Sequence, residues 1–289
     1  MNGRIIEIHN LSKYYGKARG VTDVSFEVEP GDFFGFIGPN GAGKSTTIRV
    51  LMGLIKASSG EARLFGLDVW ADRPATLTRL GYLPSEINFY KNQSVEDVLK
   101  LAARLHSSNC GPETDSLCER LKLDRKQQVA DLSLGNRKKL GIVAALQHKP
   151  ELIVMDEPTS GLDPLMQHEF FSILKERNAA GATVFLSSHI LSEVQTHCRR
   201  AAIIREGSLV ACDDVGNLLK TSARSITVRG VFNPEGIKGC SNIQKNGDSV
   251  HFLYDGDIRM LLGILSQAEL EDLSIVEPNL EDIFMHYYK

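Results

Sequence analysis

The sequence predicts an α/β fold built around a mainly parallel sheet, because apolar strands alternate with helical segments along most of the chain. Leu152–Met155 is a continuous apolar run, which is typical of a strand buried on both faces of a parallel sheet. Phe33–Ile37 is a second short apolar run, and it leads directly into a glycine-rich loop. Helical patterns follow both runs, at Pro164–Asn178 and at Ser45–Ile55, as expected for strand–helix–strand units.

Apolar periodicity and turn residues predict the remaining elements. Strands are expected at Ile5–Ile8, Val24–Val28, Glu61–Leu64, Leu80–Leu83, Thr183–Ser187, Ala201–Ile204 and Leu209–Ala211. Helices are expected at Ser94–Leu105, Glu113–Leu121, Leu140–Gln147 and Ile190–Cys198. After about Lys220 the pattern changes to two strands, Ser225–Arg229 and Ser249–Tyr254, and one helix, Met260–Ala268. We therefore expect one domain over residues 1–220 and a small α+β domain over residues 221–289.

Composition and charge argue against several classes of protein. Of the 289 residues, 42% are hydrophobic and 24% are charged, which is ordinary for a globular protein with a real core. The net charge of −3 does not favour a nucleic-acid partner. No stretch approaches the about 20 apolar residues that span a bilayer, and residues 1–10 lack a signal-peptide pattern. The five cysteines include no CxxC pair, so we expect reduced thiols.

The loop GPNGAGKST matches the phosphate-binding pattern G-x-x-x-x-G-K-[ST]. Its glycines let consecutive main-chain N–H groups point inward at phosphate oxygens, and the helix that follows presents its positive end to the same anion. We expect Lys44 to contact the β- and γ-phosphates and Ser45 to bind Mg²⁺. The expected nucleotide-binding residues of this loop are Gly38, Pro39, Asn40, Gly41, Ala42, Gly43, Lys44, Ser45 and Thr46.

Two carboxylates, Asp156 and Glu157, follow the apolar run Leu152–Met155. Such a strand end lies at the carboxyl edge of a parallel sheet, where ligands bind in α/β folds. We expect Asp156 to hold Mg²⁺ through water, and Glu157 to act as the base that activates the attacking water. A solvent-exposed acidic strand end is the alternative, and the complete phosphate loop in the same chain disfavours it.

Together these motifs resemble those of the ABC-type ATPases, the nucleotide-binding subunits of ABC transporters. Further segments match the family in its order, namely Tyr15 before Gly16, Gly81–Pro84, Leu132–Asn136, Ser160–Asp163 and His189. The resemblance covers residues 4 to about 220. It implies ATP and Mg²⁺ as cofactors, ATP hydrolysis, and the P-loop NTPase core of this family with a helical subdomain over about residues 85–148.

The resemblance assigns two further residues to the nucleotide. Tyr15 would stack its ring on adenine, although the adjacent Tyr14 is an alternative and a packed tyrosine at a strand end is another. His189 would contact the γ-phosphate through an imidazole N–H, whereas a lone histidine is more often structural.

The segment Leu132–Asn136 implies a dimer. The helix that Ser133 and Gly135 open offers free N–H groups, which form an anion site. In the family, this site faces the γ-phosphate held by another subunit. Asp163 belongs to a loop that also binds at this site in the family. A second copy of the chain would complete two shared sites, with a paralogous partner as the alternative. A simple N-cap is the other interpretation of Ser133.

Two positions depart from the family pattern. The usual signature LSGGQ is LSLGN here, so that Leu134 replaces a glycine and Asn136 a glutamine. Ser85 stands where the family usually has glutamine; we expect it to contact Mg²⁺ or its water over a shorter reach, with Glu86 as a neighbouring alternative. These changes concern the hydrolysis rate and coupling more than ATP binding.

The end of the chain, Glu277–Phe284 with Tyr287 and Tyr288, resembles the tail of bacterial type-2 ABC exporter ATPases. The ATPases of that family serve exporters of drugs, antibiotics and sodium, in which the permease is a separate membrane protein. The resemblance therefore implies a cytoplasmic subunit, held at the inner face of the membrane by a permease that contacts roughly Ser85–Leu123. Phe89 and Tyr90 are the expected anchors, and core packing is the alternative for each. The tail either supports the dimer or regulates it.

Two other classes of function remain open. Soluble ABC ATPases that act on ribosomes or DNA have tandem cassettes in one chain or carry long coiled-coil insertions. This chain shows one cassette and no heptad run. A regulatory subunit with weak hydrolysis is suggested by Ser85 and Leu134, whereas the presence of Glu157 and His189 argues against it.

Overall fold

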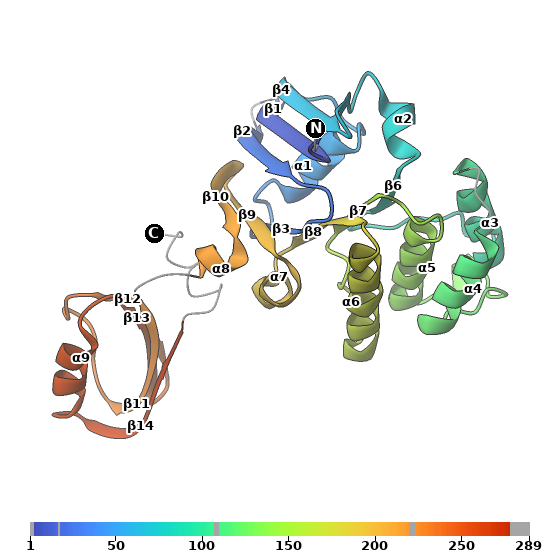
Figure 1. Cartoon of the computed structure of the whole chain (residues 1–289). Helices are drawn as coiled ribbons and strands as arrows, with labels where there is room; N and C mark the ends of the chain where they lie inside the picture. Colours follow the sequence, from blue (N-terminus) through green and yellow to red (C-terminus); the bar gives the residue numbers. More distant parts are fainter. Residues whose placement is uncertain (1–2, 17, 107–109, 220–222, 278–289) are drawn as a thin grey trace. The chain divides into compact units, whose positions relative to one another are not determined.

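The computed structural model of the 289-residue chain describes residues 3–16, 18–106, 110–219 and 223–277 (Figure 1). The chain divides into two compact units, Met1–Cys212 and Asp213–Lys289. The sequence places this boundary later, near residue 220. The short helix α8 (Val215–Leu218), which the sequence does not predict, belongs to the second unit.

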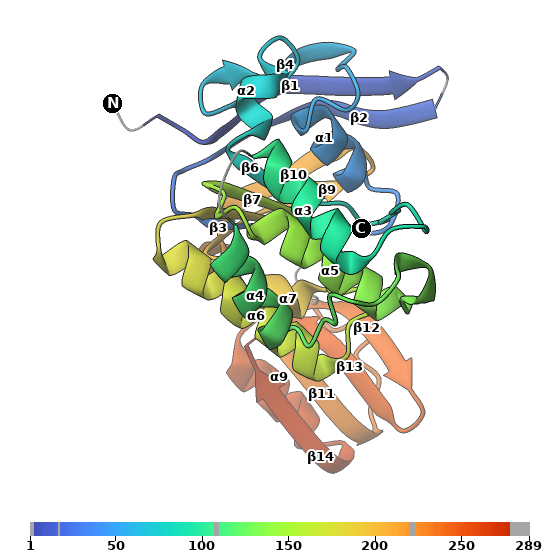
Figure 2. The ribbon, with the colours of Figure 1, turned by 90° about the vertical axis from the view of Figure 1, so that its right-hand side faces the viewer.

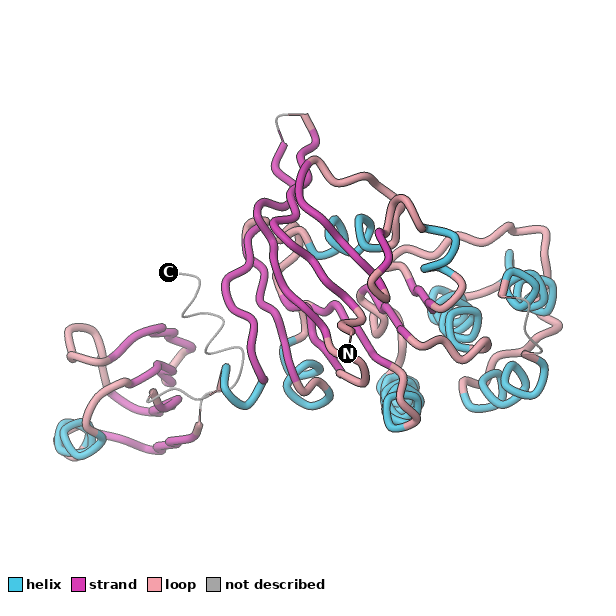
Figure 3. The backbone as a smooth tube through the Cα atoms, turned by 45° about the horizontal axis from the view of Figure 1, so that its top comes forward, coloured by secondary structure: helices cyan, strands magenta, loops and turns pink. Residues whose placement is uncertain are grey.

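The first unit contains two sheets, and the larger one is the predicted parallel sheet (Figure 3). The smaller sheet has the order β2-β1-β4-β5, from β1 (Ile6–Tyr15), β2 (Ala18–Val28), β4 (Ser59–Leu64) and β5 (Leu67–Asp68). The larger sheet has the order β10-β9-β3-β8-β7-β6, from β3 (Phe33–Ile37), β6 (Leu80–Leu83), β7 (Leu152–Asp156), β8 (Thr183–Ser188), β9 (Arg200–Arg205) and β10 (Ser208–Asp214). Strands β9, β3, β8, β7 and β6 pair in parallel, so the predicted α/β fold is confirmed.

Helices connect the strands of the first unit. They are α1 (Lys44–Leu51), α2 (Arg73–Leu77), α3 (Val95–Leu105), α4 (Gly111–Arg120), the 3₁₀ turn Val129–Asp131, α5 (Leu134–Leu146), α6 (Pro164–Ala179) and α7 (Leu191–His197). Helix α1 ends before the predicted Ile55, where Gly53 turns the chain with a φ of +61°. Helix α5 begins before the predicted Leu140, because Ser133 caps it. Among the described residues, no helix has the length and apolar character that crossing a membrane requires.

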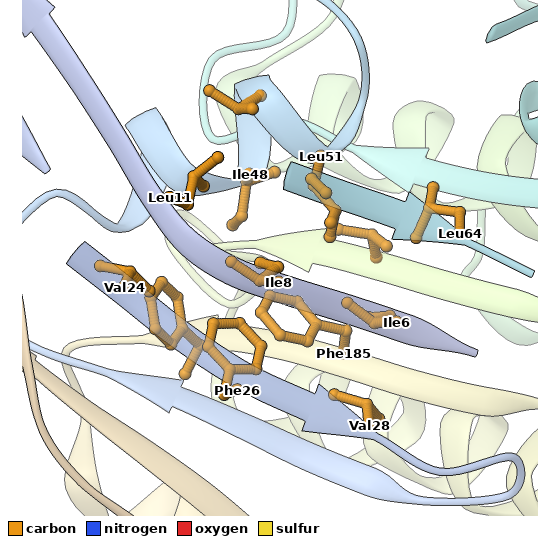
Figure 4. Close-up of a cluster of buried hydrophobic side chains, with 14 of the residues drawn as sticks. Ile6, Ile8, Leu11, Val24, Phe26, Val28, Ile48, Leu51, Leu64 and Phe185 are labelled. Atoms are coloured by element: carbon orange, nitrogen blue, oxygen red, sulfur yellow. The ribbon is translucent and has the colours of Figure 1, made fainter. Parts of the chain in front are cut away.

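An aromatic core joins the two sheets of the first unit. Phe26 of β2 lies against Phe34 of β3 and Phe185 of β8, with ring centroids 5.6 and 6.0 Å apart and planes within 10°. Figure 4 shows Phe26 and Phe185 among apolar side chains from β1, β2, β4 and α1. Because dispersion and apolar burial favour such stacked rings, this core fixes the strands that carry the site.

Helices α3, α4 and α5 come between the phosphate loop and β7 in the sequence, and α3 and α4 both contact α5 (Figure 2). A reciprocal capping box starts α3, since Ser94 accepts from the N–H of Asp97 and the Asp97 carboxylate accepts from the N–H of Ser94. The buried Gln147 at the end of α5 joins all three helices: it donates to Leu99 O and accepts from the hydroxyl of Thr114.

The second unit is a four-stranded antiparallel sheet with one helix. The sheet has the order β12-β13-β11-β14, from β11 (Arg224–Val231), β12 (Cys240–Asn246), β13 (Ser249–Tyr254) and β14 (Glu269–Val276). Helix α9 (Ile258–Leu265) packs on it through Leu261 and Leu265. The sequence analysis misses β12, which is mostly polar, and β14, whose residues are largely exposed. Residues 278–289, which include the predicted tail motif, lie outside the described residues.

We expect Phe185→Ala to lower the free energy of unfolding of the first unit by about 3–5 kcal/mol, because it removes a fully buried ring and leaves a cavity. Trp70 is the single tryptophan and lies in this unit, so urea unfolding followed by its fluorescence measures the change. The exposed Leu54→Ala is the control, with a change below about 0.5 kcal/mol. Equal losses for the two variants would contradict the assignment of Phe185 to the core.

Candidate active site

The carboxyl ends of three neighbouring parallel strands bring the predicted motifs to one edge of the large sheet. Strand β8 lies between β3 and β7. Ile37 pairs with Ser188, so the glycine loop begins beside the end of β8. Asp156 pairs with Ser187, which places the two carboxylates at the same level. Parallel pairing thus gathers three segments that are far apart in the sequence, at the sheet edge where α/β proteins bind ligands.

The glycine loop wraps a concave main-chain surface in front of α1. Gly41 and Gly43 have φ values of +80° and +107°, in the left-handed region that favours glycine. A Cβ atom at Gly43 would lie 2.5 Å from a methyl carbon of Val21, so the close approach of β2 also requires glycine there. Gly43 precedes the first residue of α1, whose free N–H groups form an anion site.

The ammonium group of Lys44 is buried inside this loop, and the side chain is only 6% exposed. Its Nζ donates to the carbonyl oxygens of Gly38 and Pro39, over 2.5 and 3.3 Å. It also lies 3.1 Å from Oε1 of Glu157, at ion-pair distance but without hydrogen-bond geometry. The loop therefore holds a fixed positive charge directed toward the end of β7.

Glu157 connects this charge to His189. Its backbone has a φ of +51°, which is uncommon outside glycine, and its N–H donates to Ser187 O. Its Oε2 lies 2.5 Å from Nδ1 of His189. Its Oε1 is buried, lies at ion-pair distance from Lys44 and has no hydrogen-bond partner among the described residues. The geometry suits a carboxylate that takes a proton from a water molecule.

Asp156 is buried at the end of β7 and is 2% exposed. The hydroxyl of Ser187 donates to its Oδ1 over 2.5 Å, which fixes one oxygen and leaves the other for a further partner. The sequence analysis misses Ser187, because a fully buried strand shows no alternation that would single out a polar position.

A cavity of about 320 Å³ lies in front of the loop. Its wall includes the predicted residues Tyr15, Pro39, Asn40, Gly41, Gly43, Lys44, Ser45, Thr46, Ser85 and Glu157. The other predicted residues of the loop, Gly38 and Ala42, are buried behind this wall. The structure thus brings together one aromatic ring, the phosphate loop and the expected base around one space.

Tyr15 and not Tyr14 belongs to the wall of this cavity. The ring of Tyr15 packs on Gly20, where a Cβ atom would lie 3.1 Å from its Cε2. Lys13 places its ammonium 5.5 Å from the ring centroid. A half-exposed ring beside the phosphate loop suits stacking on a flat base.

Ser133, Gly135 and Asp163 lie elsewhere, around the start of α5 and α6. Ser133 accepts from the N–H of Asn136, and Asp163 accepts from the N–H of Met166, so each is the N-cap of its helix. A Cβ atom at Gly135 would lie 2.9 Å from Gly161 O, which places the two loops in direct contact. Leu134, the residue between Ser133 and Gly135, is 67% exposed. None of Ser133, Gly135 and Asp163 belongs to the wall of the phosphate cavity of its own chain.

The described residues contain no group of three or more His, Cys, Asp or Glu side chains arranged to hold a metal ion. Mg²⁺ at phosphates usually takes only one or two protein ligands, so it does not require such a group. Ser45, in the cavity wall, and Asp156, at the end of β7, are the residues whose oxygens fit such a role.

An inward-facing glycine loop, a buried lysine and a carboxylate pair on a parallel sheet define a P-loop protein that binds a nucleoside triphosphate. The family described as ABC transporter matches residues 21–160. The bacitracin transport ATP-binding protein BcrA of Bacillus licheniformis is 40% identical over 71% of this chain and 68% of its own length. The chain belongs to the ABC transporter family, as an ATP-binding subunit that hydrolyses ATP.

The likeness includes the second unit and extends to solved structures. The linearmycin resistance ATP-binding protein LnrL of Bacillus subtilis is 31% identical over 98% of this chain and 97% of its own length. A structure described as the ATP-binding subunit of an ABC transporter superposes with a TM-score of 0.70 at 30% identity, covering 74% of this chain and 91% of that one. These likenesses confirm the family that the sequence motifs indicate.

We expect Lys44→Met to weaken ATP binding about 30- to 150-fold, because it removes a charge-assisted contact worth about 2–3 kcal/mol. Titration with a fluorescent ATP analogue measures the affinity. The exposed Lys91→Met is the control, since it removes the same charge outside the cavity wall. Parental affinity in Lys44→Met would show that the loop does not bind the phosphates.

Proposed function

We propose that the chain drives a separate membrane permease by binding and hydrolysing Mg²⁺-ATP at two sites shared with a second copy of itself. The observation that carries this proposal is the position of Glu157, between the ammonium of Lys44 and the imidazole of His189. Oε1 of this carboxylate pairs with Lys44 and Oε2 pairs with His189, and Glu157 lies in the wall of the phosphate cavity. This arrangement supports hydrolysis as well as binding.

Phosphate oxygens would compete with Glu157 for Lys44. Both ligands are anionic, and Lys44 is held by the carbonyls of Gly38 and Pro39 whichever anion it meets. Once Lys44 binds the phosphates, Oε1 of Glu157 is free to accept the proton of an attacking water molecule. His189 holds the other oxygen, which orients the carboxylate. Mg²⁺ bound by Ser45 and Asp156 would neutralise charge on the β- and γ-phosphates.

The second copy is proposed because one chain carries two separate halves of a site. The phosphate cavity lies at the end of β3, whereas the N-terminus of α5 with Ser133 and Gly135 lies outside that cavity. Helix N-termini bind anions, and the apolar Leu134 and Leu165 beside it are 67% and 75% exposed. A two-fold dimer would place each α5 N-terminus over the partner's nucleotide and cover both leucines. A paralogous partner is the alternative.

The permease is proposed to dock at an apolar groove of about 440 Å³ that lies beside β6. Its wall includes Leu77, Leu80, Leu105 and Ala145, together with His106 and His148. Leu105 is 72% exposed at the end of α3, and Leu101 one turn earlier is also exposed. Of the anchors expected from the sequence, Tyr90 is exposed and Phe89 is half-buried. Exposed apolar side chains around a groove favour a protein partner.

The named relatives support a transport role over the alternatives. They are ATP-binding subunits associated with bacitracin transport and linearmycin resistance. On this basis we propose export of a peptide or antibiotic-like compound, with the chain at the cytoplasmic face of the membrane. The relatives do not favour a factor acting on ribosomes or DNA. The pairing of Glu157 with His189 supports hydrolysis over a purely regulatory role.

We expect Glu157→Gln to lower ATP turnover at least about 100-fold while ATP binding is retained, because the amide cannot accept the proton. Phosphate release measures turnover, and size-exclusion chromatography with ATP is expected to show a trapped dimer. The exposed Glu61→Gln is the matched control. Turnover unchanged by Glu157→Gln would remove this residue from the role of base.

We expect Leu105→Glu to abolish co-purification with the proposed permease partner, because the charge enters the apolar groove. Basal ATP turnover is expected to stay within about twofold, since Leu105 lies outside the phosphate cavity. Leu54→Glu, an equally charged change at an exposed leucine outside the groove, is the control. Undiminished co-purification of Leu105→Glu would place the docking surface elsewhere.

A further inference from the structure

Lys138 is a buried lysine close to the site that the proposed hydrolysis does not use. It lies in the second turn of α5 and is only 4% exposed. Its Nζ donates to the main-chain oxygen of Ser85 over 3.2 Å. A buried ammonium is costly unless a partner compensates it, so this contact is a specific feature of the fold.

Two opposing influences act on the charge of Lys138, and burial is the larger, so that the pKa of its ammonium group lies below the ordinary value. Burial lowers the pKa of the ammonium group, and the negative charges of Asp156 and Glu157 act in the opposite direction. The positive charge on α5 is therefore within the electrostatic reach of both carboxylates of the hydrolytic site. It adds to the positive field of Lys44, whose Nζ lies 3.1 Å from Oε1 of Glu157.

The segment after β6 rests directly on the same face of α5. Gly141 is three residues after Lys138 and therefore lies on the same side of the helix. A Cβ atom at Gly141 would lie 2.7 Å from the Cδ1 atoms of both Leu83 and Ile87. The absence of a side chain at Gly141 and the hydrogen bond from Lys138 thus fix residues 83–87 on α5 by two independent contacts.

Ser85 is the point where two cavities meet. It lines the phosphate cavity together with Lys44 and Glu157. It also lines a second cavity of about 260 Å³, whose wall includes Lys138 and Leu134. The side chain of Ser85 is too short to reach far into either cavity. The contact with α5 is made instead by Lys138, which donates to the main-chain oxygen of Ser85.

We propose that Lys138 is a positioning residue that fastens α5 to the Ser85 segment, and so couples the contents of the phosphate cavity to the N-terminus of α5 at Ser133. This inference rests on the proposed function, because it assigns to α5 the surface that meets the second copy. ATP that alters the position of Ser85 would move α5 through this contact. Without it, ATP binding would favour closure of the dimer less strongly, because the position of α5 would no longer depend on Ser85.

The test is Lys138→Met, which keeps the length of the side chain and removes its donor and charge. We expect kcat for ATP to fall about tenfold, with KM changed by less than about twofold. In the Glu157→Gln background, the ATP-bound dimer is expected to dissociate about tenfold more readily, while each chain binds ATP with parental affinity. Lys138→Arg retains the donor, and the adjacent cavity has room for it, so we expect it to restore most of both losses.

Lys139→Met is the matched control, because it removes an equal charge one position along the same helix. Values of kcat and of dimer affinity in Lys138→Met that stay within about twofold of the parental values would overturn the proposal. So would equal losses in Lys139→Met, or a lowered Tm with losses that Lys138→Arg does not reverse, which would identify a packing role. If Lys138→Met does not fold, Lys138→Gln replaces it, with an expected kcat loss of about threefold; parental values there would also contradict the proposal.

The parental chain separates this inference from the proposed function. If the parent neither hydrolyses ATP nor forms an ATP-dependent dimer with Glu157→Gln, the proposed function fails. If the parent does both and Lys138→Met does so equally well, only the role of Lys138 fails.

Discussion

The compensation of one buried positive charge, the ammonium of Lys44, is the constraint on which the site depends. Two carbonyl oxygens of the glycine loop and the carboxylate of Glu157 provide that compensation. The carbonyls can approach the ammonium only because the loop turns through left-handed glycines. The carboxylate of Glu157 is in reach of Lys44 because β7 ends level with β8, and β8 in turn lies next to β3. A triphosphate would compete with Glu157 alone, so binding of the ligand would release the carboxylate that we propose as the base.

The aromatic core explains how this arrangement is held in place. Phe34 and Phe185 belong to β3 and β8, the strands that lead to the glycine loop and to His189, and Phe26 joins both to the antiparallel sheet. The sheet edge is consequently rigid, as site geometry on regular elements usually is. Helix α5 meets this rigid edge through Lys138 and Gly141. The proposed coupling would thus run from a fixed edge to a helix that carries the surface for the second copy.

Local patterns in the sequence predict most of this architecture, and the remainder depends on tertiary contacts. The parallel sheet, the phosphate loop and the pair Asp156–Glu157 each have a signature within about ten residues. Apolar periodicity predicts α5 only from Leu140, because Asn136 and Arg137 weaken the helical pattern, whereas the N-cap interpretation of Ser133 agrees with its hydrogen bond. Strand β14 is missed because its four apolar residues, Leu270, Leu273, Ile275 and Val276, do not keep a regular alternation and none of them is fully buried. The role of Lys138 could not be predicted, since a lysine in a polar run gives no sign of burial.

The central claim, that Lys44 exchanges Glu157 for phosphate oxygens, is tested most directly by a crystal structure of the chain with Mg²⁺ and a non-hydrolysable ATP analogue. The account predicts that Nζ of Lys44 lies within hydrogen-bond distance of the β- and γ-phosphate oxygens. It also predicts that Glu157 turns from Lys44 toward a water molecule near the γ-phosphate while remaining in contact with His189. A bound nucleotide with the 3.1 Å approach of Lys44 to Glu157 preserved would contradict the account.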